Sequence, residues 1–137
     1  MSHVLASRKE RPWWRDAVTY QIYIRSFADS NGDGIGDVEG IRSRLAYLKQ
    51  LGVDAIWITP WYPSPQNDHG YDVSDYMDIE PQYGTLADAE KLIKATHEHG
   101  LKFIVDIVPN HTSDQHKWFQ EALKAAPGSP ERDRYMF

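Results

Sequence analysis

Hydrophobic positions follow two different spacings along the chain. Residues 17–24, 53–59 and 102–108 are short runs rich in Val, Ile and aromatic residues, which predicts three buried strands. Apolar residues recur at helical spacing over 38–51, and two further helices are expected over 86–99 and 115–125. Residues 76–79 are considered as a short extra strand. Strands separated by helices predict βαβ units with right-handed crossovers, and therefore an α/β fold with a parallel sheet.

Glycine, proline and capping residues mark the ends of these elements. A helix, a glycine, a strand and a proline follow one another at Gly52/Pro60, and the same order returns at Gly100/Pro109. Thr85 with Asp88 three residues later is a capping pair for the helix at 86–99. Ser113 or Asp114 is expected to cap the helix at 115–125.

Composition excludes several classes of protein. The 137 residues suffice for one ordinary domain, and a net charge of -5 without a basic patch argues against nucleic-acid binding. The chain has no cysteine, so disulfides and thiolate metal sites are excluded. The polar start, residues 1–12, is interpreted as a leader without a secretory signal, and we expect a cytoplasmic protein without a membrane span.

The loop after the first predicted strand has the composition of a metal site. Its oxygen-bearing side chains alternate at Asp29, Asn31, Asp33 and Asp37, and glycine at the sixth position leaves the Ile35 carbonyl as a further ligand. A hard cation such as Ca²⁺ or Mg²⁺ prefers such a set of oxygens, as in the first nine positions of an EF-hand loop. The bidentate Glu of that motif is missing, because Gly40 stands there. The bland interpretation is a solvated acidic turn in which Asp37 caps a helix.

Two later loops carry groups that can hold a polyol. Asp68 and Tyr71 lie in the loop 67–72 after the second strand, where a carboxylate can accept hydroxyl hydrogen bonds and a ring can stack on a sugar. Asp106 interrupts the third strand, where a buried carboxylate is costly unless it is paired, and His111 lies just beyond. Trp61 and Tyr62 are considered as lining residues of a sugar site, whereas Asp72 is assigned to turn chemistry. All three loops follow the carboxyl ends of parallel strands, where α/β folds bind ligands.

Four segments together resemble one enzyme family over most of the chain. From Trp13 to Phe137 the chain is similar to the start of the catalytic barrel of α-glucosidases in the α-amylase superfamily, glycoside hydrolase family 13. The resemblance rests on WWRDAVTYQIYIRSFADSNGDGIGD, GVDAIWITPWYPSPQNDHGYDVSDY, YGTLADAEKLI and DIVPNHTSD. It implies a (β/α)8 TIM barrel, of which residues 13–130 would form the first three βα units. Residues 131–137 would begin a domain inserted after the third strand.

The resemblance also implies roles for single residues. Asp29, Asn31, Asp33, the Ile35 carbonyl and Asp37 match the family's structural calcium or magnesium loop. Asp68 matches a carboxylate that holds a hydroxyl of the terminal glucose, and Tyr71 matches the ring that stacks on that glucose. His111 matches the histidine that binds its 6-hydroxyl, and Asp106 matches an aspartate of the site floor that orients its neighbours. His69 departs from the family, where Asn or Asp is frequent.

The function implied is that of a retaining glycosidase that releases terminal α-linked glucose from oligosaccharides or disaccharides. The family's nucleophile Asp and acid/base Glu follow later strands, so no catalytic residue is expected in this chain, and the chain alone is expected to be inactive. No obligate protein partner is implied. Three alternatives stay open: a transglucosylase of the trehalose synthase or sucrose isomerase type, a small calcium-binding module, and a small flavodoxin-like domain, which an exposed sheet edge makes a poor candidate.

Overall fold

The computed structural model describes residues 11–137, and they form a three-stranded parallel sheet with helices. The strands are β1 (Thr19–Ile22), β2 (Ala55–Ile58) and β3 (Lys102–Val105), in the order β1-β2-β3. Thr19 pairs with Ala55, and Ala55 pairs with Lys102, so the three strands start in register. The prediction of an α/β fold with a parallel sheet is confirmed. The predicted leader falls largely on residues 1–10, which lie outside the described part.

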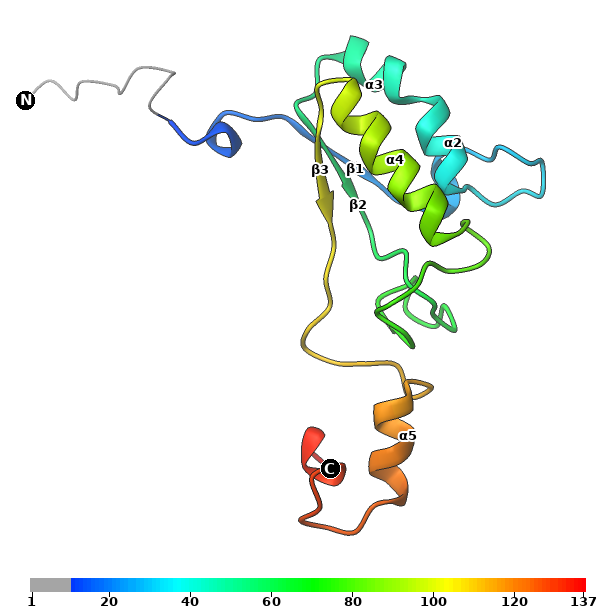
Figure 1. Cartoon of the computed structure of the whole chain (residues 1–137), viewed down its shortest axis with the longest axis vertical. Helices are drawn as coiled ribbons and strands as arrows, with labels where there is room; N and C mark the ends of the chain where they lie inside the picture. Colours follow the sequence, from blue (N-terminus) through cyan, green and yellow to red (C-terminus); the bar gives the residue numbers. More distant parts are fainter. Residues whose placement is uncertain (1–10) are drawn as a thin grey trace, which may run out of the picture.

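The helices of the crossovers cover one side of the sheet (Figure 1). They are α2 (Val38–Ser43), α3 (Leu45–Leu51) and α4 (Leu86–Glu98), and a single turn, α1 (Ile24–Phe27), follows β1. The helical spacing seen in the sequence places apolar side chains of α2, α3 and α4 in the core. The buried apolar cluster consists of Ile22, Ile24, Val38, Ile41, Leu45, Leu48, Val53, Ile56, Ile58, Trp61, Ile79, Tyr83, Ala89, Leu92 and Leu101.

A second group of elements lies beyond the carboxyl ends of the strands. It contains α5 (Lys117–Lys124) and the 3-10 turn η2 (Arg132–Arg134), and it is joined to β3 by an extended segment (Figure 1). A 3-10 turn, η1 (Trp13–Arg15), precedes β1 at the other end of the sheet. No helix within residues 11–137 has the length and apolar character needed to cross a bilayer.

The capping pair was predicted correctly. The Thr85 hydroxyl accepts a hydrogen bond from Asp88 N, and the Asp88 carboxylate accepts from Thr85 N at 3.1 Å, which completes a capping box. Hydrogen bonds from Thr85 and Lys91 lower the pKa of Asp88 to about 2. Gly52 ends α3 in the left-handed conformation, with φ of 89°, as its place after the helix indicated.

The predicted helix at 38–51 is two helices. Arg44 breaks it with φ of -104° and ψ of 3°, and its N–H bonds to Ile41 O at 3.0 Å in a tighter, 3-10-like turn. The Ser43 hydroxyl donates to Gly40 O at 2.7 Å and so competes with the regular backbone ladder.

Strand ends were also predicted wrongly. The expected strand at 17–24 stops at Ile22, because Ile24 already begins α1. The expected strand at 102–108 stops at Val105, because its partner β2 ends at Ile58 and Pro60 has no N–H to continue the ladder. Residues 76–79 are not a strand. The cap of α5 is His116, whose Nδ1 accepts from Trp118 N at 3.1 Å, and not Ser113 or Asp114.

Candidate functional site

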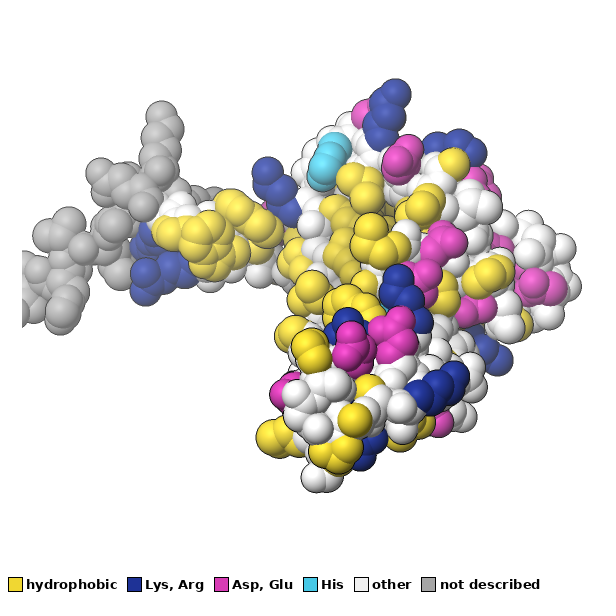
Figure 2. Space-filling view, turned by 60° about the horizontal axis from the view of Figure 1, so that its bottom comes forward, with side chains coloured by type: hydrophobic (Ala, Val, Ile, Leu, Met, Phe, Trp, Pro, Cys, Tyr) yellow, Lys and Arg dark blue, Asp and Glu magenta, His cyan; other side chains and the backbone are white. Residues whose placement is uncertain are grey.

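The sugar-binding candidates all lie at the carboxyl ends of β2 and β3. Asp68 and Tyr71 belong to the long segment after β2, and Asp106 and His111 follow β3. In Figure 2, which brings the lower side of Figure 1 forward, hydrophobic side chains are exposed across the middle of the face, and acidic and basic side chains lie below them. Strand pairing in register brings the two loops to the same edge of the sheet.

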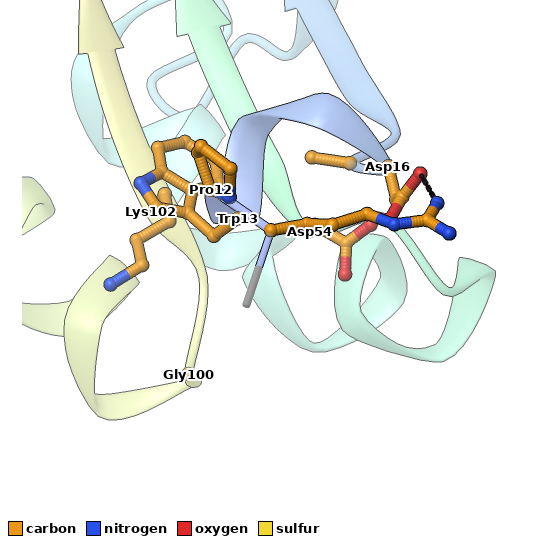
Figure 3. Close-up of a pocket in the computed structure, with 8 residues that line it drawn as sticks. Pro12, Trp13, Asp16, Asp54, Gly100 and Lys102 are labelled. Atoms are coloured by element: carbon orange, nitrogen blue, oxygen red, sulfur yellow. Dashed lines mark ion pairs between the residues drawn. The ribbon is translucent and has the colours of Figure 1, made fainter. Parts of the chain in front are cut away.

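A hollow lies at the opposite end of the sheet from these loops. It measures about 460 Å³, and Figure 3 shows Trp13, Asp16, Asp54 and Lys102 around it. Both carboxylates that line the hollow make contacts within the fold. Asp16 pairs with Arg11 at 3.5 Å, and Asp54 Oδ2 accepts from Val18 N at 2.8 Å. None of the predicted site residues lines this hollow. The amino ends of the strands therefore do not carry the predicted chemistry.

Tyr71 and Asp106 join the loops after β2 and β3. The Tyr71 hydroxyl donates to Asp106 Oδ2 at 3.0 Å across 35 residues of sequence. Partial burial raises the pKa of the Tyr71 phenol, and the bond to Asp106 and the negative charges of Asp106 and Asp68 raise it further. Tyr71 thus stays a hydrogen-bond donor at neutral pH. Asp106 is half-buried rather than fully buried as predicted, because β3 ends before it.

His111 lies against the backbone of Tyr71. Its Nε2 is 3.1 Å from Tyr71 O, and its Nδ1 is 3.3 Å from Asn110 Nδ2. A carbonyl oxygen can only accept and an amide nitrogen can only donate, so the imidazole that satisfies both contacts carries its proton on Nε2. The ring is exposed. His111 therefore belongs to the same group as Tyr71 and Asp106.

Asp68 presents an exposed carboxylate beside Tyr71. Its backbone oxygen accepts from Tyr71 N at 3.0 Å, which closes a tight turn. Its charge helps to raise the pKa of the Tyr71 phenol, as expected for two side chains on one turn. The structure thus brings together the four residues predicted to bind a sugar, which are Asp68, Tyr71, Asp106 and His111.

Three aromatic residues near the site differ in their burial and contacts. Trp61 is 5% exposed and packs on Phe103, so it belongs to the core and does not line a sugar site. Tyr62 is half-buried, and its hydroxyl donates to Asp106 O at 3.1 Å. Tyr76, which the sequence did not single out, donates its hydroxyl to Val108 O at 2.6 Å and lies 2.9 Å from His111 O. The residues next to Tyr62 and Tyr76 in the sequence give no signal of these contacts, because the contacts join residues 32 to 44 positions apart.

The predicted metal loop, residues 29–37, is folded by its own side chains. Asp29 accepts from the N–H groups of Asn31, Gly32 and Gly34 at 2.7–3.0 Å, and these bonds lower the pKa of its carboxyl. Asn31 Oδ1 accepts from Asp33 N at 2.9 Å, and Asp33 Oδ1 accepts from Ile35 N at 2.8 Å. Each alternate side chain therefore turns toward the loop's own backbone.

Asp37 anchors the end of this loop. It is 6% exposed, and its Oδ1 caps α2 by accepting from Gly40 N at 2.6 Å. Its Oδ2 accepts from the N–H and the hydroxyl of Ser30 at 3.0 and 2.8 Å. The helix-cap interpretation of Asp37 is thus confirmed. In the described range, 11–137, no three His, Asp or Glu side chains gather closely enough to hold a metal ion. The oxygen-only donor set still fits a hard cation by its chemistry, and metal binding stays a prediction.

Known proteins resemble this chain over nearly its whole length. Residues 21–137 match the alpha-amylase family, described as the alpha amylase catalytic domain. The chain is 54% identical over 128 residues to an oligo-1,6-glucosidase of Parageobacillus thermoglucosidasius, covering 93% of this chain and 23% of that protein. It is 54% identical over 135 residues to an alpha-glucosidase of Schizosaccharomyces pombe, covering 98% of this chain and 23% of that protein.

Solved structures agree with these relatives. A trehalulose synthase from Pseudomonas mesoacidophila matches with a TM-score of 0.88 and 51% identity over 92% of this chain and 22% of that one. A trehalose-6-phosphate hydrolase from Bacillus licheniformis matches with a TM-score of 0.87 and 52% identity over the same shares. The chain thus spans less than a quarter of the length of the relatives that it matches. By sequence and by fold, it belongs to the alpha-amylase family and corresponds to part of the catalytic domain of that family.

Proposed function

We propose that this chain supplies the glucose-binding part of a glycoside hydrolase that cleaves terminal α-linked glucose from oligosaccharides or disaccharides. The observation that carries the proposal is the bond between the Tyr71 hydroxyl and the Asp106 carboxylate, at 3.0 Å. This bond gathers the loops after β2 and β3 into one polar group beside an aromatic ring. Relatives named oligo-1,6-glucosidase and alpha-glucosidase support the same substrate class.

Each residue of the group has a role in this proposal. The exposed Asp68 carboxylate accepts hydrogen bonds from sugar hydroxyls, and the Tyr71 ring stacks on the C–H face of glucose. His111 binds the 6-hydroxyl with a ring nitrogen, which gives up its present contact with Tyr71 O or with Asn110 Nδ2. Asp106 is half-buried and bonded to Tyr71, so it orients the ring and is not itself a nucleophile.

The chemical step requires groups that we place outside this chain. A retaining glycosidase needs a nucleophilic carboxylate and an acid/base carboxyl about 5–5.5 Å apart. From the family resemblance we expect them after the fourth and fifth strands of a (β/α)8 barrel, of which β1–β3 would be the first three. The whole enzyme would carry out hydrolysis, and this chain would bind and orient the glucosyl unit.

The loop 29–37 is proposed to hold a structural Ca²⁺ or Mg²⁺. Asp29, Asn31, Asp33, Asp37 and the Ile35 carbonyl would be its ligands. A cation there would neutralise the carboxylates and tie the start of α2 to the end of β1. It would take no part in bond cleavage. Because the family match from residue 21 includes this loop, a free-standing calcium module is the weaker interpretation.

A second candidate is glucosyl transfer. The solved relatives include a trehalulose synthase, one form of which is described in complex with the substrate sucrose. An enzyme of that type would use the same glucose-binding group and then pass the glucosyl unit to a sugar hydroxyl instead of water. The residues described here serve both reactions equally.

The test compares this chain with a hybrid enzyme, in which the chain replaces the matched segment of the Parageobacillus oligo-1,6-glucosidase. The hybrid should hydrolyse an aryl α-glucoside, and the 137-residue chain alone should not. Turnover by the chain alone would show that its own carboxylates are catalytic. A folded hybrid without any α-glucosidase activity would contradict the proposed glucose-binding role.

A further inference from the structure

The turn that carries Asp68 has an unfavourable backbone. Gln66 and His69, with φ of 62° and 54°, are the two non-glycine residues with positive φ in the range 11–137, and they lie on either side of Asp68. Gly70 continues the bend with φ of 98°, and a Cβ there would lie 2.9 Å from Pro60 O. The Gln66 Nε2 is also buried without a hydrogen-bond partner among the described residues. Such a turn persists only where its surroundings hold it.

The Asp72 carboxylate supplies that support. Its Oδ2 accepts from Asn67 N at 2.8 Å, and its Oδ1 accepts from Asp68 N at 3.2 Å. The Ser64 hydroxyl donates to the same Oδ1 at 2.7 Å, and Ser64 Oγ in turn accepts from Gln66 N at 3.0 Å. Asp72 and Ser64 thus form a clasp, defined here by these two side chains, that closes the segment from Ser64 to Asp72.

The clasp is electrostatically suited to this role. Partial burial raises the pKa of the Asp72 carboxyl, but the Ser64 hydroxyl and the N–H groups of Asn67 and Asp68 outweigh burial and lower it overall. The carboxylate is therefore ionised at neutral pH and accepts with both oxygens. Its bonds reach the backbone of Asp68 and leave the Asp68 side chain exposed. Asp72 acts on the site only through the backbone.

We propose that Asp72 is a positioning residue: with Ser64 it holds the strained turn at which Asp68 meets the sugar, and so sets the affinity of the glucose-binding group. The proposal rests on the proposed function for the ligand, and on the turn's geometry for the mechanism. A residue that merely stabilised the loop would lower the melting temperature without changing the binding of substrate well below that temperature.

The first experiment measures kinetics in the hybrid enzyme. Asp72→Asn places an amide donor against N–H or hydroxyl donors, and it should raise KM for an aryl α-glucoside by about tenfold with a smaller change in kcat. Ser64→Ala removes one of the three donors and should raise KM less. The control is Asp78→Asn on the same segment. The Asp78 carboxylate accepts from the neighbouring Ile79 N at 2.8 Å, and its substitution should leave KM within about twofold.

The second experiment measures amide hydrogen exchange in the full 137-residue chain and needs no activity. The amides of Asn67 and Asp68 should exchange at least about tenfold faster in Asp72→Asn than in the unchanged chain or in Asp78→Asn. Unchanged exchange at these two amides would overturn the clasp, whether or not the hybrid is active. Faster exchange with an unchanged KM in an active hybrid would overturn its effect on affinity. An inactive hybrid with faster exchange would contradict the proposed function and support the clasp.

Discussion

The loop after β1 and the loops after β2 and β3 lie at the same end of the sheet, but their side-chain hydrogen bonds span different distances along the sequence. In the 29–37 loop, the side-chain bonds join residues two to seven positions apart, from Asn31 N to Asp29 up to Ser30 to Asp37. In the later loops, Tyr71 reaches Asp106 across 35 residues and Tyr62 reaches the same residue across 44. The first loop is thus organised by its own side chains, whereas the group of Tyr71, Asp106 and His111, proposed to bind glucose, forms only when the sheet has brought two loops together.

This difference predicts separate effects of mutation. Changes in the later loops should reduce binding and turnover with little loss of stability, because their residues are exposed or half-buried. Changes in the 29–37 loop should reduce stability with little loss of turnover, because its bonds hold the connection between β1 and α2. The predictions below go from the largest expected effect to the smallest.

The largest effect is expected for His111→Ala in the hybrid enzyme. The substitution removes an exposed ring that contacts the Tyr71 carbonyl at 3.1 Å, so the fold should remain and kcat/KM for an aryl α-glucoside should fall about 100-fold. Steady-state kinetics with circular dichroism as a fold check measures both quantities. Unchanged kcat/KM in the variant would show that His111 does not take part in substrate binding.

A middle-sized effect is expected for the 29–37 loop. If a cation binds there, chelation should lower the melting temperature of the hybrid enzyme by several degrees, since a metal at 100 times its Kd contributes about 2.7 kcal/mol. Asp33→Ala should have the lower melting temperature already and should not respond to the chelator. The conservative control is Asp33→Asn, which keeps an oxygen and should respond in part. The metal site would be refuted if the melting temperature changed neither when the chelator is added to the unchanged hybrid nor when Asp33 is replaced by Ala.

The smallest effect is expected from the titration of His116, which lies beside the later loops. Burial lowers the pKa of His116, with Lys117 adding to this and Asp75 and Glu121 opposing it. Its neutral Nδ1 caps α5, and its ring packs on Tyr76, whose hydroxyl holds the His111 backbone. Since the folded pKa lies below the unfolded value of about 6.5, stability is complete above pH 6.5 and declines as pH falls through the folded pKa.

Thermal melts of the hybrid enzyme at several pH values test this. His116→Asn keeps a capping oxygen without a titrating group, so its melting temperature should fall less between pH 7 and pH 5 than that of the unchanged hybrid. Equal slopes in the two proteins would show that His116 does not link pH to stability.

The two kinds of loop also explain what the sequence could predict. The spacing of Asp29, Asn31 and Asp33 is a local pattern, and the structure keeps the bonds local. The capping box of Thr85 and Asp88 was predictable for the same reason. Asp68, Tyr71, Asp106 and His111 were predictable as residues, because polar groups at the carboxyl ends of parallel strands share one edge.

What the sequence could not predict depends on contacts between distant segments. Trp61 is of a residue type that is common in sugar sites, but it packs on Phe103 and is buried. Tyr62 and Tyr76 carry no local signal, since their acceptors are backbone carbonyls after β3. Asp72 was assigned to turn chemistry, which is correct for its bonds, but the strain on either side of Asp68 appears only in backbone angles.

A crystal structure of the hybrid enzyme with glucose bound is the most direct test of the glucose-binding role. The sugar ring should lie on Tyr71, with hydroxyls bonded to Asp68 and His111 and with the Tyr71–Asp106 bond intact. Glucose seated elsewhere, for example in the hollow of Figure 3 at the amino ends of the strands, with no contact to Asp68, Tyr71 or His111, would contradict it.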